Sequence, residues 1–121
     1  MREAQKTYAA VAKETASPRE LEASLLLRAA AKLQFVHDGW SNDPTGLDDA
    51  ILYNRRLWTI FLDAVLGTES PLPVAVRQNI ANLGVFVMSE TFSLMTQPKP
   101  DHLVPLIHIN RELAAGLRGG A

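Results

Sequence analysis

The chain has 121 residues, of which 47% are apolar and 21% charged, and it contains no cysteine. This length fits one compact domain, and the apolar fraction is too high for a disordered tail. With 12 Lys and Arg against 13 Asp and Glu, the formal net charge is −1, which gives no basic field to recruit nucleic acid or anionic lipid. The lack of cysteine excludes disulfides, thiolate metal sites and cysteine nucleophiles.

The start of the chain, Met1 to Lys6, is polar and lacks the apolar core of a signal peptide. No stretch approaches the roughly 18 apolar residues that span a bilayer. The sequence therefore predicts a cytoplasmic protein that does not insert into membranes, or one exported by a route that leaves no cleavable signal.

Proline and glycine divide the chain into five segments that each predict a helix. The first, from Ala4 to about Lys13, is Ala-rich and too short to be stable alone, so it must dock on something. The second opens with the capping box Ser17-Pro18-Arg19-Glu20 and closes at Gly39. Its apolar residues recur at helical spacing, at Leu21, Leu25, Leu26, Ala29, Ala30, Leu33 and Val36.

The third segment runs from about Leu47 to Leu66, with Asp48 and Asp49 in the first turn, where the helix dipole favours carboxylates. Its stripe consists of Leu47, Ala50, Ile51, Asn54, Leu57, Trp58, Phe61, Leu62 and Val65. The fourth, from Pro73 to about Thr96, has one apolar row through Val76, Ile80, Leu83, Val87 and Leu94 and another through Ala81, Val85, Met88, Phe92 and Met95. A helix that is apolar on two faces is either central in a bundle or covered by a partner.

The fifth segment follows Pro100 and extends to about Leu117, either with Asp101 as its cap or starting nearer Val104, because Pro105 restricts the first turn. Its stripe consists of Leu103, Leu106, Ile107, Asn110, Leu113, Ala114 and Leu117. Together the segments predict an all-α fold, a small bundle of about five helices. We expect one domain over residues 1–121, with residues 1–3 and 118–121 frayed.

Two asparagines, Asn54 and Asn110, each interrupt an otherwise apolar stripe. An unsatisfied buried amide costs about 1–3 kcal/mol, so both must find partners. We expect them to pair with each other or to cap a neighbouring helix end, in a structural polar network that fixes the register of the helices. The alternative is that they bind the backbone of a partner protein.

The nearest approach to a basic cluster is formed by Arg55, Arg56 and Arg111. Adjacent helical residues point about 100° apart, so a solvated face or ion pairs explain these arginines better than an RNA site does. The three histidines, at positions 37, 102 and 108, have no metal-binding spacing. The chain also lacks a nucleophile elbow, a phosphate-binding loop and a dinucleotide motif, so we expect neither a cofactor nor catalysis.

A surplus of apolar residues is more informative about function. Trp40 lies in a polar turn region, Trp58 lies on a stripe, and Phe86 lies on the otherwise polar side of the fourth segment. Met88 and Met95 add deformable surface of the kind that accommodates another helix. Each residue alone is compatible with core packing, but together they favour a helix-binding protein over an enzyme.

Several strings carry a resemblance to a known family. They are Tyr8 in the first segment, Ser17 to Ala30, the central Asn54-Arg55-Arg56-Leu57-Trp58, and Ile109-Asn110-Arg111 near the end. With these strings the sequence resembles the FlaF family of bacterial flagellar biosynthesis regulators over nearly its whole length. The central string and its distance from the later Asn-Arg pair are the specific part of the resemblance.

The resemblance implies a small, cytoplasmic, non-enzymatic helical protein that supports flagellin production. It implies an export chaperone that binds flagellin and acts in flagellin regulation alongside FlbT, a protein that restrains flagellin translation. Unassembled flagellin has exposed helical ends, which a small amphipathic bundle could cover. The alternative is a helical adaptor that acts post-transcriptionally through FlbT or flagellin mRNA, although the near-neutral charge argues against RNA binding.

The binding residues are chosen from their chemistry, because the resemblance supplies none. We expect an apolar groove beside the fourth segment to hold the partner, with four anchors: Phe86, Met88, Phe92 and Met95. The three arginines, Arg55, Arg56 and Arg111, would orient the partner or pair with its carboxylates, and Trp58 would complete the site.

Overall fold

The computed structural model describes residues 18–119, which form four α-helices: α2 (Pro18–Asp38), α3 (Leu47–Leu66), α4 (Val74–Thr96) and α5 (Leu103–Gly119). A short 3₁₀ helix, η1 (Pro100–His102), precedes α5. No strand occurs within these residues, so the prediction of an all-α fold is confirmed. The predicted first helix and its Tyr8, and the predicted cap Ser17, lie outside the described residues.

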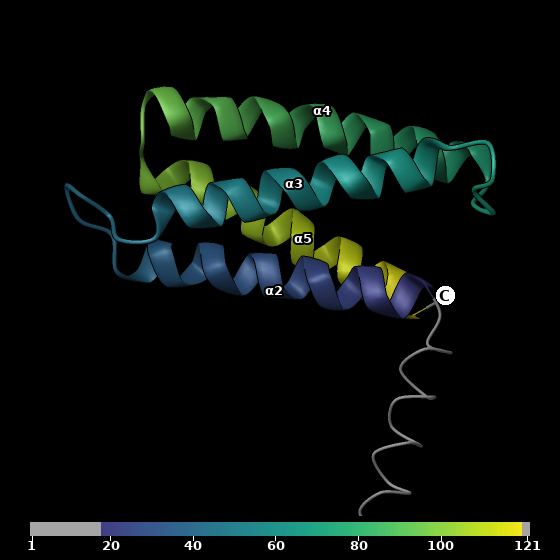
Figure 1. The fold of residues 1–121 in the computed structure, drawn as a ribbon, viewed down its shortest axis with the longest axis horizontal. Coiled ribbons are helices and arrows are strands. Elements are labelled where there is room, and N and C mark those ends of the chain that lie inside the picture. The colour runs from purple at the N-terminus through teal and green to yellow at the C-terminus, as the bar shows by residue number, and fades with distance from the viewer. Residues whose placement is uncertain (1–17, 120–121) are drawn as a thin grey trace, which may run out of the picture.

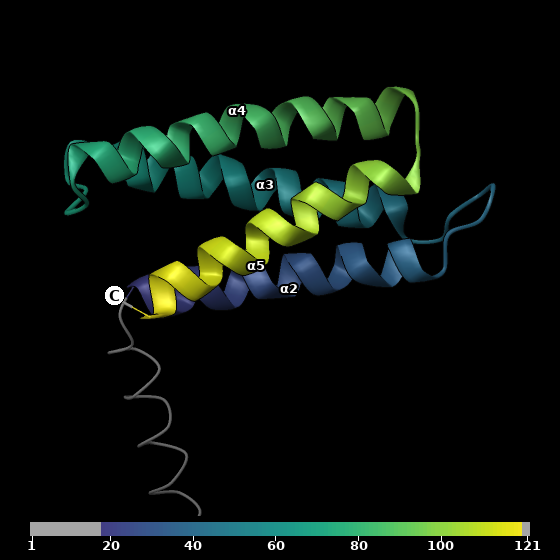
Figure 2. The same ribbon diagram turned by 180° about the vertical axis from the view of Figure 1, so that it is seen from behind.

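The helices form two layers (Figure 1). Helices α2, α3 and α4 lie side by side and alternate in direction, with α3 in the middle, and α5 crosses behind them. Seen from behind, α5 lies in front and runs diagonally across the bundle (Figure 2). It packs chiefly against α2, whereas α4 packs chiefly against α3. One face of α3 therefore points into the core, and the opposite face points away from α5.

Small side chains explain the close contact between α2 and α5. Ala23 and Ala30 on α2 and Ala114 on α5 are all fully buried in one apolar cluster, and alanines let two helices approach closely. Beyond this contact, Arg118 near the end of α5 lies 3.6 Å from the Glu20 carboxylate and donates to Ser24 Oγ at 3.2 Å. These two contacts hold the end of α5 against the beginning of α2.

Two glycines fit places where a side chain would be strained. Gly46, just before α3, has a φ of 83°, in the left-handed region that favours glycine. Gly84 is buried where α4 meets α3, and a Cβ there would lie 2.7 Å from Leu62 Cδ1. The absent side chain at Gly84 lets the two helices pack closely.

The predicted α3 agrees with the structure in its bounds, and its predicted stripe is buried except at Leu57 and Leu62, which are partly buried. Helix α5 begins at Leu103, after η1 and between the two predicted starts, and Pro105 lies within its first turn. One expectation was wrong, because Leu21 is 56% exposed rather than buried. Of the two alternatives for the doubly apolar α4, the structure excludes the central position, since the second row faces outward with Val85 73% exposed. Helix α4 is therefore an outer helix of the bundle and not its centre.

Candidate partner-binding surface

The two asparagines that interrupt apolar stripes meet in the core between α3 and α5. Asn110 Nδ2 donates to Asn54 Oδ1 at 2.7 Å, which is the first of the two arrangements expected from the sequence. Trp58 Nε1 in turn donates to Asn110 Oδ1 at 2.9 Å. All three side chains are buried, and Asn54 Nδ2 has no hydrogen-bond partner among the described residues. The network therefore joins α3 to α5 rather than facing a ligand.

The expectation that Trp58 belongs to a partner-binding site needs correction. Its side chain is fully buried, and its ring packs edge-on against Phe61 with centroids 5.6 Å apart. A buried indole N–H needs an acceptor, and Asn110 provides it. The sequence contained a signal for this contact, because Trp58 lies one helical turn after Asn54 on the same stripe.

The outward face of α3, which points away from α5, carries exposed apolar side chains. Ile60 is 69% exposed, and Leu52, two turns earlier, is also exposed. On the α2 side lies a groove of about 300 Å³, lined by Leu25, Leu52, Tyr53, Arg56, Leu57 and Ile60 together with Asp49. On the α4 side lies a wider groove of about 560 Å³, lined by Thr59, Ile60, Leu62, Asp63, Leu66, Gly67 and Met88. We call this surface, from Leu52 to Leu66 with its two grooves, the α3 face.

Arg55 and Arg56 both belong to this face. Together with Leu52, Thr59 and Ile60 they line a shallow depression of about 350 Å³ on the outside of α3. Neither guanidinium forms an ion pair within residues 18–119, whereas Asp49 nearby lies 3.2 Å from Lys32 Nζ. The third predicted arginine, Arg111, is exposed on α5, in the other layer of the fold. The three arginines are therefore not one cluster.

The four predicted anchors on α4 do not share one face. Met88, Phe92 and Met95 follow one another at helical spacing, and Met88 lines the α4-side groove. Phe86 lies about 120° around the helix from Phe92. Its side of α4 is the side of Glu90, which contacts Nδ1 of His102 in η1 at 3.0 Å. Phe86 is therefore removed from the predicted groove, and of the other three only Met88 lines a groove of the α3 face.

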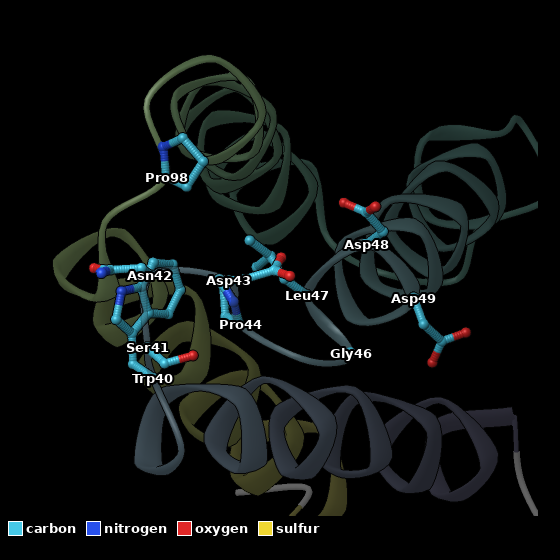
Figure 3. A pocket seen from close by; sticks show the side chains of 10 residues that line it. All are labelled: Trp40, Ser41, Asn42, Asp43, Pro44, Gly46, Leu47, Asp48, Asp49 and Pro98. Carbon is cyan, nitrogen blue, oxygen red and sulfur yellow. The ribbon is translucent and has the colours of Figure 1, made fainter.

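A polar hollow of about 510 Å³ lies between the loop after α2, the first turn of α3 and Pro98 (Figure 3). Trp40 and Asn42 both line it, and Asp48 and Asp49 project from the start of α3. As the sequence predicted, these two carboxylates occupy the first turn of the helix, where they stabilise its N-terminus. No group of three His, Cys, Asp or Glu residues in the described part of the chain could hold a metal ion.

The histidines have separate surroundings. His37 lies in the last turn of α2, His102 contacts Glu90, and His108 is exposed on α5. None of the helices between residues 18 and 119 combines the length and the apolar run needed to cross a bilayer. The α3 face combines exposed apolar side chains, open grooves and two arginines without an ion-pair partner among residues 18–119.

Comparison with protein families matches residues 4–117 to the family described as "Flagellar protein FlaF". Searches of curated proteins and of solved structures found no match. The family match spans nearly the whole chain, including every helix contact that forms the core and all of the α3 face. The chain therefore belongs to the FlaF family of flagellar proteins.

Proposed function

We propose that this protein is a cytoplasmic, non-enzymatic secretion chaperone that binds flagellin and supports flagellin synthesis and export together with FlbT. The observation that carries the proposal is the α3 face, where exposed apolar side chains and two arginines without ion-pair partners in the described part lie beside open grooves. Membership of a flagellar protein family supports flagellin as the partner.

The physical argument rests on unburied apolar area. Each Å² of apolar surface removed from water contributes roughly 25 cal/mol, and Ile60 and Phe92 keep most of their side chains exposed. A partner helix that covers these side chains gains that energy, and Met88 in the groove adapts its shape to the partner. Flagellin before assembly offers such helices at its ends.

The test is a calorimetric titration of the full chain with purified flagellin, and then with flagellin that lacks its C-terminal helix, at two salt concentrations. Micromolar or tighter binding that disappears with the truncation and changes little with salt supports a chaperone that holds an apolar helix. Absence of binding to either form contradicts the proposal. It would favour the alternative, an adaptor acting on flagellin expression through FlbT or flagellin mRNA, and FlbT would be titrated next.

A further inference from the structure

The residues at the centre of the α3 face have a regular spacing. Leu52, Arg56 and Ile60 follow one another every four residues, so they form a ridge along the outside of α3. Each step is about 6 Å along the helix axis, so Leu52 and Ile60 are about 12 Å apart. Ile60 lines the grooves on both sides of this ridge as well as the depression on top of it, which makes it the centre of the surface.

The charges on the α3 face, from Leu52 to Leu66, are unevenly placed. Arg55 and Arg56 lie in its N-terminal half, without an ion-pair partner among the described residues. Lys32 and Asp49 beside them pair with each other, so they leave the positive charge in place. Asp63, which lines the groove toward α4, gives the C-terminal half the opposite sign. A ligand that matches this pattern must bring negative charge to the Arg56 end and none to the Asp63 end.

We propose that the α3 face binds an amphipathic helix that carries a carboxylate midway between two apolar residues about two turns apart. The apolar residues would contact Leu52 and Ile60, and the carboxylate would pair with Arg56. This inference rests on the proposed function, since it identifies the docking surface and the chemistry of the flagellin helix that occupies it. A ridge of residues four apart fits the groove between two rows of side chains on a second helix.

The alternative surface, the outer stripe of α4, lacks one element of this recognition. Val85, Phe92 and Met95 are exposed, but none of the grooves around Arg55 and Arg56 is lined by them. An apolar stripe without a charge gives adhesion without orientation, because charged groups fix register and partner choice. The α3 face supplies both the apolar contacts and the charge.

The experiment uses pairs of exposed residues in the two layers of the fold, so that each variant has a matched control. Ile60→Ser is compared with Val104→Ser on α5, which removes another exposed β-branched side chain. Arg56→Glu is compared with Arg111→Glu, also on α5. Flagellin binding is measured by calorimetry, and circular dichroism establishes that each variant keeps the helical content of the parent.

We expect Ile60→Ser and Arg56→Glu each to raise the Kd for flagellin about tenfold or more, the effect typical of a central contact. The two α5 controls should change it less than about twofold. A Glu→Arg or Asp→Arg substitution at one position of the flagellin helix should restore binding to the Arg56→Glu variant.

Three outcomes overturn the inference, and they are distinguishable. If Phe92→Ser weakens binding and Ile60→Ser does not, the docking surface lies on α4, and the proposed function stands without this inference. If no charge reversal in flagellin rescues Arg56→Glu, the occupant lacks the carboxylate. If the parent protein does not bind flagellin at all, both the inference and the proposed function are wrong.

Discussion

The buried polar network predicts that substitution of its two asparagines lowers the stability of the protein by different amounts. Replacing Asn110 by Ala removes the partner of Trp58 Nε1 and the partner of Asn54 Oδ1. Each buried polar group left without a partner costs about 1–3 kcal/mol, so the loss from hydrogen bonding is about 2–6 kcal/mol. That is a large part of the about 5–15 kcal/mol by which a domain is typically stable.

Replacing Asn54 by Ala removes the same atoms from an equally buried site, but the loss of stability from hydrogen bonding is smaller. It leaves one group, Asn110 Nδ2, without its partner, which costs about 1–3 kcal/mol. It also removes Asn54 Nδ2, which already lacks a partner, so a similar cost disappears from the folded state. Because both substitutions leave a cavity of similar size, Asn110→Ala should be the more destabilising by at least about 2 kcal/mol.

Urea unfolding of the full chain, followed by circular dichroism, measures this difference. With a slope of about 1–3 kcal/mol/M, the midpoint of Asn110→Ala should lie about 1 M below that of Asn54→Ala. Equal midpoints, or a lower one for Asn54→Ala, would refute the hydrogen-bond assignment. The double variant should be less destabilised than the sum of the single ones, because the two residues share one bond.

Three further predictions concern packing and backbone geometry. Gly84→Ala should destabilise the protein by about 1 kcal/mol, because the gain in helix propensity only partly offsets the overlap with Leu62. In a Leu62→Ala background the same substitution should become neutral or stabilising, and a cost that persists there would contradict the contact. Gly46→Ala should lower stability by about 1–2 kcal/mol through its positive φ, whereas Gly39→Ala, with no contact closer than 3.6 Å, should stay within about 0.5 kcal/mol. A Trp40→Phe variant should show blue-shifted fluorescence emission from Trp58 that acrylamide hardly quenches, since the Trp58 side chain is fully buried. Strong quenching would contradict the place of Trp58 in the core.

The sequence predicted the helices better than it predicted their surroundings. The stripe of α3 defined the buried face correctly, because this helix has neighbours on both sides within its layer as well as α5 behind it. The rows of α4 were ambiguous, because periodicity reports that a face is apolar and not whether anything covers it. Leu21 illustrates the same limit, since its spacing matched the buried stripe of α2 and yet its side chain is exposed.

The candidate surface was predicted in part. The arginines were singled out, but their separation into two layers depends on how α3 and α5 cross, which sequence spacing does not encode. Phe86 was grouped with Met88 and Phe92 by composition, although its angle around α4 already placed it on another side. Ile60 was missed because it lies outside the core stripe, and a lone apolar residue on a surface is ordinary. Only the neighbouring grooves distinguish it.

The contact between the end of α5 and the beginning of α2 has a consequence for biosynthesis. Ser24 and Arg118, which form a hydrogen bond, are 94 residues apart in the chain, so α2 meets its chief neighbour only after nearly everything between them has been translated. A nascent chain that ends after α4 presents the alanine face of α2 and the inner face of α3 without α5 to cover them. Long-range closure of this kind slows folding, so the α2–α5 contact forms only after α5 itself has been synthesised.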